Sequence, residues 1–500
     1  MTSISTGTPR LRPYALVLIT LIVAEATGAF EAAMLSSAVP KLIADFGITT
    51  ADMGWAFSGF LLVGAASAAI GGRLGDLFGR KKVLMIVLVV SIVGSLVSIL
   101  IGTFPAIIAG RSIQGVSAAV LPLIIGIARE AVVPKRVPLT IAVVAGTVTI
   151  AGSLGFLVSG YLVQFSSWHA IFIASGVLAA VATVLALFTL NRSPVTHQKG
   201  EKLDFFGGVL FVPALALILY GVTTSQGAGW ASPVVLGCIG AGAVLLAVWV
   251  WWELRVPKPL LNLRLLGRPK YALTVGIIAA LAFGSMGGMQ LVTPILLQAP
   301  TTAPVGLGLT PSAFGTLSLV LGVIGYVFAP LSGLIAGRAG AKRSMLIGIL
   351  ILLVGFPGYI IFRDNLFVIA GVMLLQGAGI TFALTSVPNL LAEAIPKANM
   401  SEGMGFSVVA RSTAQAIGIS VFSVALSSSV VPGTPLPQLS AFVLVIIMAI
   451  VGIAVALVLV LLIKGGKAKL DDNGEVIDET TVGSPDPAKV RAVASAANGA

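Results

Sequence analysis

The stretch "GGRLGDLFGRKKVL", residues 71–84, lies between two long apolar runs and decides how the rest of the chain is interpreted. Five charged residues fall within ten positions: Arg73, Asp76, Arg80, Lys81 and Lys82. Glycine permits tight turning, and basic side chains favour the anionic face of a membrane. Such a segment is typical of a short loop that joins two membrane helices on the cytoplasmic side.

The composition places the chain in a membrane. Apolar residues make up 57% of the 500 residues, charged residues 10%, and the mean hydropathy is +1.07. Soluble domains average about 25% charged residues, so this is an integral membrane protein of the all-α class. One cysteine and two histidines leave neither a disulfide framework nor a credible metal site. We therefore expect no metal, no cofactor and no enzymatic active site.

Fourteen apolar runs are long enough to cross a hydrocarbon core, which takes about 20 residues each. They cover residues 14–34, 53–72, 83–101, 105–127, 138–162, 168–190, 205–224, 233–252, 271–292, 313–335, 344–362, 366–390, 403–427 and 439–463. With both termini cytoplasmic, 26 of the 30 Lys and Arg residues lie inside and only Lys41 and Arg363 lie outside. This is the positive-inside pattern, and it accounts for the net charge of +12 without a nucleic-acid partner.

The domain organisation follows from the spacing of these runs. We expect a cytoplasmic N-terminus at 1–13, a six-helix bundle at 14–190, an inserted helix pair at 205–252 and a second six-helix bundle at 271–463. Residues 464–500 hold few large apolar side chains, which predicts a disordered cytoplasmic tail.

An internal repeat supports the two bundles. "GRLGDLFGRKK" from Gly72 aligns with "GLIAGRAGAKR" from Gly333, and "RSIQG" from Arg111 aligns with "MLLQG" from Met373. Each pair stands in the same helix of its half. Two six-helix halves of this kind are typical of secondary transporters.

Four charged side chains fall inside the predicted spans: Glu25, Glu31, Arg111 and Arg411. At 1.5 Å per residue, Glu31 lies roughly 5 Å and Arg111 roughly 9 Å from the outer ends of their spans, whereas Glu25 lies about 14 Å deep. A carboxyl beside an arginine keeps its charge, but an apolar cavity favours its protonated form. Movement between these surroundings would let Glu31 load and release a proton.

Three sequence motifs resemble those of the major facilitator superfamily, and specifically its fourteen-helix drug:proton antiporter family. The segment from Gly72 to Lys82 is similar to the loop signature of that superfamily, and "RSIQG" is similar to its fourth-helix motif. "EAAMLSSAVP", from Glu31 to Pro40, resembles the first-helix signature, with Glu in place of the usual Asp. One departure stands in the fifth helix, where "GFLVSG" has Phe156 and Ser159 at positions that exporters fill with proline and glycine.

The resemblance implies a gating role for Gly72, Asp76, Gly79 and Arg80. Asp76 would bind the N-terminus of the helix that begins near Ser401 and so latch the two halves together on the cytoplasmic side. The alternative is a solvated loop whose basic residues only fix orientation. The second copy has Gly337 in place of Asp76, so the latch would be one-sided.

The resemblance also favours Glu31 as the acid that couples transport to protons, with Arg111 as its partner. Greater depth favours Glu25 as a proton or substrate-cation site, or else as a buried glutamate satisfied by its neighbours. Gln114, Gln290, Arg411, Phe57 and Phe60 are candidates for a substrate cavity, although amides also link helices and aromatic rings also fill cores.

We conclude that the sequence predicts a proton-coupled secondary transporter of the bacterial inner membrane, most simply a monomeric exporter of hydrophobic small molecules. Phe156 and Ser159 keep open a second interpretation, the proton-coupled uptake of a small organic molecule. A sensor or scaffold without flux is a third, but it gives no reason for costly buried acids.

Overall fold

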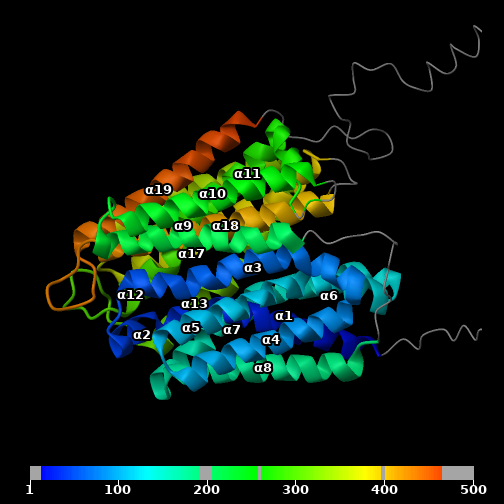
Figure 1. The fold of residues 1–500 in the computed structure, drawn as a ribbon, viewed down its shortest axis with the longest axis horizontal. Coiled ribbons are helices and arrows are strands. Elements are labelled where there is room, and N and C mark those ends of the chain that lie inside the picture. Colours follow the sequence, from blue (N-terminus) through cyan, green and yellow to red (C-terminus); the bar gives the residue numbers. More distant parts are fainter. Residues whose placement is uncertain (1–12, 192–204, 257–258, 260, 396–399, 464–500) are drawn as a thin grey trace, which may run out of the picture.

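Long helices run side by side between the two ends of the molecule in the computed structural model, which describes residues 13–191, 205–256, 259, 261–395 and 400–463 (Figure 1). The start of α1 and the end of α19 lie at the same end, on the right of Figure 1, which we call the termini end. The opposite end is the far end. The N-terminal segment 1–13, apart from Pro13, and the tail 464–500 lie outside the described residues.

The first bundle contains six crossings. They are α1 (Tyr14–Met34) with η1 (Ser36–Ala38) and α2 (Val39–Phe46); α3 (Thr50–Phe78); α4 (Arg80–Ile101); α5 (Phe104–Gln114) with η2 (Gly115–Ala119) and α6 (Val120–Ala131); η3 (Pro134–Arg136) with α7 (Val137–Phe165); and α8 (Trp168–Thr189). The inserted pair is α9 (Phe205–Ala228) and α10 (Pro233–Arg255), followed by a short turn, η4 (Leu263–Gly267).

The second bundle repeats the arrangement. Its crossings are α11 (Pro269–Leu281) with a π-helical segment η5 (Ala282–Gly287) and α12 (Met289–Gln298); α13 (Pro311–Tyr326) with α14 (Phe328–Ala339); α15 (Ala341–Gly355) with α16 (Gly358–Ile361); α17 (Leu366–Ala392); α18 (Met400–Ser427); and α19 (Leu439–Leu462). Thirteen described stretches are long and apolar enough to span a membrane, and α9 is the fourteenth helix. The fourteen-helix prediction is confirmed.

The charged segment at 71–84 is more helical than the sequence predicted. Helix α3 continues to Phe78 and α4 starts at Arg80, so only Gly79 interrupts the helices, with φ 89° and ψ 123°. Its repeat partner Gly340 has φ 95° and ψ 150°. These positive φ values suit glycine and explain why both copies keep it. Gly72 makes no turn and no close contact, because a Cβ there would meet nothing within 4 Å.

The repeat also preserves a lysine that caps a helix in each bundle. The Lys81 ammonium donates to the carbonyl oxygens of Leu187 at 2.8 Å and Leu190 at 2.6 Å, at the end of α8. The Lys342 ammonium donates to the carbonyl of Ile463 at 2.6 Å, at the end of α19. Cations are stabilised by the unpaired carbonyls at a helix C-terminus. The aligned basic residues therefore tie the third helix of each bundle to its sixth.

The first crossing extends beyond Met34, because η1 and α2 follow directly and the apolar stretch continues to Phe46. The depth of roughly 5 Å predicted for Glu31 was therefore wrong, since it was measured from a helix end that is not the end of the span. Glu31 is 0% exposed in the interior of the first bundle.

The two bundles meet at the far end. The Thr50 hydroxyl of α3 donates to the carbonyl of Ser423 in α18, and the Ala51 amide donates to Ser427 Oγ at 2.9 Å. On the other flank, the Ser312 amide at the start of α13 donates to Gln164 Oε1 in α7 at 3.1 Å. Every hydrogen bond between the bundles in the described chain joins α3 to α18 or α7 to α13.

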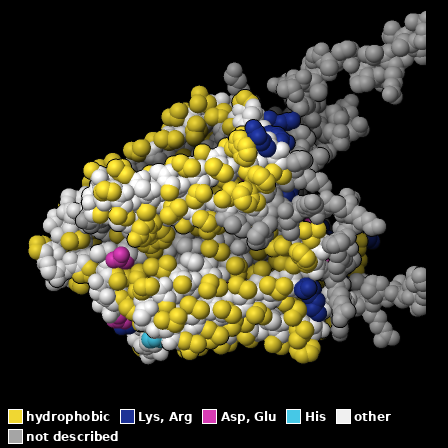
Figure 2. Space-filling view, in the orientation of Figure 1, with side chains coloured by type: hydrophobic (Ala, Val, Ile, Leu, Met, Phe, Trp, Pro, Cys, Tyr) yellow, Lys and Arg dark blue, Asp and Glu magenta, His cyan; other side chains and the backbone are white. Residues whose placement is uncertain are grey.

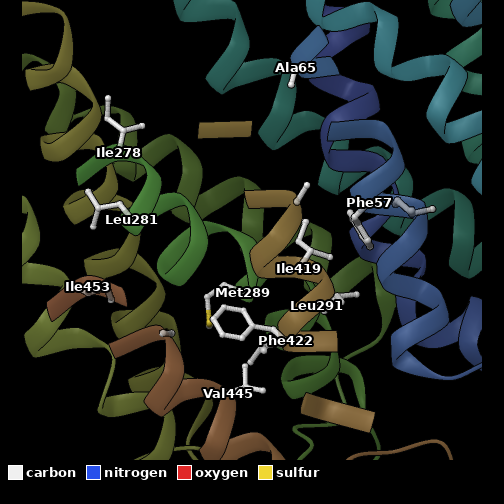
Figure 3. Close-up of a cluster of buried hydrophobic side chains, with 14 of the residues drawn as sticks. Phe57, Ala65, Ile278, Leu281, Met289, Leu291, Ile419, Phe422, Val445 and Ile453 are labelled. Atoms are coloured by element: carbon white, nitrogen blue, oxygen red, sulfur yellow. The ribbon is translucent and has the colours of Figure 1, made fainter. Parts of the chain in front are cut away.

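Apolar side chains fill the space between the helices. Figure 3 shows Phe57 of α3 near Ile419 of α18. Met289, Phe422 and Val445 of the second bundle lie on the side of Ile419 away from Phe57. The outer surface is also largely hydrophobic on the face in Figure 2, where Lys and Arg appear mainly toward the termini end and Asp and Glu toward the far end. Such an apolar belt suits a surface that faces lipid.

The inserted pair lies against the seam between the bundles. Helix α9 contacts both α3 and α18, and the rings of Trp55 and Tyr220 lie 6.3 Å apart. At the termini end, Arg73 Nη1 donates to the carbonyl of Pro259 at 3.0 Å, and Asn262 Nδ2 donates to Glu402 Oε2 at 3.0 Å. The pair therefore contacts both halves.

Candidate functional site

Glu31 is the centre of a buried polar cluster within the first bundle. Its carboxylate oxygen Oε1 accepts hydrogen bonds from the hydroxyl of Ser91 in α4 and from that of Ser175 in α8, the latter at 2.9 Å. All three side chains are 0% exposed. The carboxyl group therefore accepts hydrogen bonds from neutral hydroxyl groups of two other helices.

Arg111 lies directly beside Glu31 but contacts its backbone. Nη1 donates to the main-chain carbonyl of Glu31 at 2.8 Å and to Gln114 Oε1 at 3.1 Å. The guanidinium carbon lies 4.3 Å from the centre of the Phe60 ring, a cation–π contact. Within the described residues no ion pair joins the guanidinium to the Glu31 carboxylate, and Nε, Nη2 and Glu31 Oε2 have no hydrogen-bond partner.

Gln114 closes the cluster. Its amide nitrogen donates to Ser95 Oγ at 2.8 Å and to Ser175 Oγ at 3.2 Å, so one chain of contacts runs from Arg111 to the Glu31 carboxyl. The Glu31 carboxyl and the Arg111 guanidinium therefore belong to one hydrogen-bonded cluster, without a direct ion pair between them. The use of Glu31 as a proton carrier stays a prediction.

Glu25 is also buried, at 7% exposed, but it lies outside this cluster. Its Oε2 has no hydrogen-bond partner among the described residues, so the alternative in which neighbouring groups satisfy it is not supported. An unpartnered buried carboxyl is costly unless it is protonated or meets a cation.

Of the residues predicted to line a cavity, Phe57, Phe60 and Gln114 are buried, whereas Gln290 and Arg411 are partly exposed. Phe57 and Phe60 are buried, at 2% and 7% exposed, and Gln114 bonds within the cluster, so the structure favours the packing and helix-linking alternatives for all three. Gln290 accepts a hydrogen bond from Gln415 at 3.2 Å, which links α12 to α18. Arg411 in α18 is partly exposed and forms no ion pair with a described residue. A cavity role remains a prediction for these residues.

The predicted gate residues form a local charge cluster. Arg80 Nη2 donates to Asp76 Oδ1 at 2.7 Å, and Nη1 donates to Glu130 Oε1 at 2.8 Å and to the carbonyl of Gly126 at 3.0 Å. No hydrogen bond joins Asp76 to the described part of α18, and residues 396–399, which precede that helix, lie outside the described residues, so the latch stays a prediction. Arg80 instead ties the end of α3 to α6.

The sequence analysis missed Ser91, Ser95 and Ser175. Two of them stand four residues apart in the apolar run 83–101, a spacing that puts both hydroxyls on one helix face. This polar helix face within an apolar run could have predicted that both serines face the interior of the bundle. Glu130 gave no such signal, because a glutamate at the end of a span is usually solvated.

Curated proteins of similar sequence include drug exporters. The chain is 26% identical over 402 residues to "Multidrug resistance protein Stp" of Mycobacterium tuberculosis (strain CDC 1551 / Oshkosh), covering 80% of this chain and 73% of that protein. It is 26% identical over 324 residues to the "Tetracenomycin C resistance and export protein" of Streptomyces glaucescens, covering 65% and 59%.

Solved transporters share the fold. A peptide transporter of the POT family, solved with sulfate, superposes with a TM-score of 0.66 at 15% identity, covering 91% of this chain and 98% of that one. The inward-open xylose transporter XylE from E. coli gives a TM-score of 0.62 at 15% identity, covering 90% and 96%.

The family assignment rests on the whole length of the chain. Residues 21–299 and 276–490 each match the Major Facilitator Superfamily, and together these two overlapping matches cover both six-helix bundles and the inserted pair. Together with the fourteen helices, they show that the chain is a multi-pass membrane protein and a secondary transporter rather than an enzyme: it belongs to the Major Facilitator Superfamily.

Proposed function

We propose that this transporter exports hydrophobic small molecules in exchange for protons, and that Glu31 carries the proton. The observation that supports this proposal is the buried cluster of Glu31 and Arg111. A charge at the centre of a membrane helix costs at least about 2.5–3.5 kcal/mol on insertion scales, so a chain without a use for such groups would not retain them. Hydroxyl donors can hold the carboxyl in either protonation state.

The bundle contacts support alternating access. With cytoplasmic termini, which we propose from the distribution of basic residues, the hydrogen bonds that join the bundles in the described part of the chain lie toward the extracellular side. The described state would then face inward. Its counterpart requires the contacts of α3 with α18 and of α7 with α13 to part, and Asp76 would then be free to latch α18.

Export is favoured by the names of two relatives, a multidrug resistance protein and a tetracenomycin C resistance and export protein. Uptake remains the second candidate because of Phe156 and Ser159. In the structure Phe156 packs edge-on against Phe314 of α13, with ring centres 6.1 Å apart, and Ser159 Oγ donates to Ser37 Oγ at 2.9 Å. Phe156 therefore packs across the two bundles, whereas the Ser159 hydroxyl bonds within the first bundle.

The deciding experiment is flux in proteoliposomes with an imposed pH gradient, in both orientations and with one cationic and one neutral hydrophobic dye. We expect dye to move opposite to protons. Dye movement with protons would establish uptake instead, and no movement of either dye would favour a sensor or scaffold.

Two variants of one helix test the acid. Glu31→Gln should abolish pH-driven flux but leave dye binding and dye-for-dye exchange intact, since neither needs net proton movement. Glu25→Gln is the matched control for loss of a buried carboxyl from α1, and it should instead weaken binding of the cationic dye. Full pH-driven flux in Glu31→Gln together with its loss in Glu25→Gln would assign the proton to Glu25.

The orientation needs its own test. Reporter fusions after Gly229, at the far end between α9 and α10, and after Ile463, at the end of α19, should report opposite sides of the membrane. If both report one side, α9 does not cross and the proposed orientation fails.

A further inference from the structure

An apolar groove runs along the lipid-facing side of the second bundle, between α15–α16 and α17. It is a shallow depression, open along one side, with a volume of about 540 Å³. Its lining includes Val354, Gly355, Gly358, Ile361, Gly371 and Leu375. No part of the proton or gate clusters borders it.

Glycines shape the groove. At Gly358 the two helices touch, because a Cβ there would lie 2.5 Å from a methyl carbon of Val372. Gly371, adjacent to Val372 on α17, also lines the groove but faces open space, because a Cβ there would meet nothing within 4 Å. The groove is therefore closed at its floor and open beside Gly371.

Its rim is strongly apolar and exposed. Val354 is 75% exposed, Ile361 66% and Phe367 88%. These residues belong to crossings that span the membrane, so the surface that meets them is hydrocarbon. A flexible apolar chain fits such a groove better than water does.

A cation stands where the groove reaches the far end. Arg363 directly follows the lining residue Phe362, and its Nε has no hydrogen-bond partner among the described residues. Its Nη1 donates to the carbonyl of Ile360 at 3.3 Å, and its Nη2 lies 3.6 Å from Asp364, whose side chain is 82% exposed. The Asp364 carboxylate is well screened, and the Arg363 side chain is 30% exposed with its Nε buried, so only the outer part of the guanidinium is accessible to another anion.

Basic residues are scarce at the far end. In the described chain only Lys41 and Arg363 lie there, and Lys41 pairs with Asp45 at 3.5 Å. Arg363 is therefore the cation that a headgroup at the groove would meet.

We propose that an anionic phospholipid binds here, with one acyl chain in the groove and its phosphate on Arg363. The proposal is independent of the proton-coupled function, because the groove lies on the outer surface of one bundle. Arginine binds phosphate oxygens through two parallel N–H groups, and the glycines leave the depth that a methylene chain needs.

Native mass spectrometry of the full chain tests the site, using detergent supplemented with equal amounts of phosphatidylglycerol and phosphatidylcholine. We expect one retained phosphatidylglycerol, favoured about fivefold over phosphatidylcholine, as for one basic residue at a lipid surface. Arg363→Gln should lose this preference but retain a lipid. Gly371→Phe, which fills the groove without a clash, should lose the lipid altogether.

Two controls separate the site from general effects. Lys41→Gln removes the other far-end cation, and Gly237→Phe places the same ring at another open glycine, where a Cβ meets nothing within 4 Å; both should behave as wild type. The proposal is overturned if Gly371→Phe and Gly237→Phe retain lipid equally, or if wild type retains both lipids equally. A change of oligomeric state in Gly371→Phe alone would instead assign the groove to a second copy of this chain.

Discussion

Gly315 in α13 should control how tightly the two bundles close at the far end. A Cβ at this position would lie 2.3 Å from the carbonyl oxygen of Phe156 and 3.0 Å from the Cα of Leu157, both in α7. Ordinary contact begins near 3.4 Å, and backbone atoms cannot turn aside. Gly315→Ala therefore requires the two helices to separate by about 1 Å, which a packed interface resists.

The magnitude follows from the cost of overpacking. An extra methyl group in a well-packed site destabilises it by about 1–3 kcal/mol. Here the cost falls only on the state in which α7 and α13 touch, so the equilibrium between the two transport states should shift by about 5- to 150-fold away from that state.

Spin labels on either bundle measure this shift. With the single cysteine replaced, as Cys238→Ser, labels are placed at Lys41→Cys in the first bundle and at Phe367→Cys in the second, both at the far end. Gly315→Ala should increase the population of long distances between them. Gly325→Ala is the matched control: Gly325 lies on the same helix, and a Cβ there would meet nothing within 4 Å. Equal distance distributions in the two variants would show that Gly315 does not control the closure of the far end.

Three further predictions concern the clusters of the first bundle. Ser175→Ala removes a donor to Glu31 and should lower pH-driven flux about two- to tenfold, whereas Ser98→Ala, whose hydroxyl bonds only within its own helix, should leave flux unchanged. Asp76→Asn should destabilise the described state by less than about 1 kcal/mol, because the Asp76 side chain that pairs with Arg80 is half exposed. It should weaken the latched state by about 0.3–2 kcal/mol, so the spin-label distances should shift toward those of the described state. No shift would mean that Asp76 only helps to fix the orientation of the chain in the membrane. Gly79→Ala should lower the thermal unfolding temperature in detergent because its φ is 89°, while Gly72→Ala should not; equal temperatures would contradict the assigned turn.

The number and order of helices could be predicted from the sequence because hydrocarbon imposes one requirement on every crossing. Apolar length alone located α8, predicted at 168–190 and observed as Trp168–Thr189. The same criterion cannot find where a helix ends in water. Helix α3 starts at Thr50, where Thr49 and Asp52 form a capping box, and it ends at Phe78, well past the apolar run predicted to stop at residue 72.

The candidate site could be predicted only in part. Charge inside an apolar run drew attention to Glu31 and Arg111, and the structure places them side by side. The form of their contact depends on Ser91 and Ser175, which come from different helices whose relative rotation no local pattern determines. The same limit explains Phe57 and Phe60, since an aromatic residue in a span can face a cavity, lipid or a neighbouring helix with equal sequence evidence.

The two halves share the residues that shape the fold but differ in their charged residues. Gly79 and Lys81 have counterparts in Gly340 and Lys342 that make the same turn and the same helix cap, so these residues serve the fold of each bundle. Asp76 and Arg80 have no charged counterparts in the second half, where Gly337 and Ala341 stand.

Arg111 aligns with Met373, so the proposed proton cluster too belongs to the first bundle alone. Under that proposal, a proton taken up there would affect the second bundle through contacts that join the halves. The two most extensive of these seams in the described chain are α3 with α18 and α7 with α13, and both are packed through small residues that leave little room for gradual movement. We therefore expect coupling to be lost by variants at these seams, such as Gly315→Ala, even when Glu31 and its hydroxyl donors are intact.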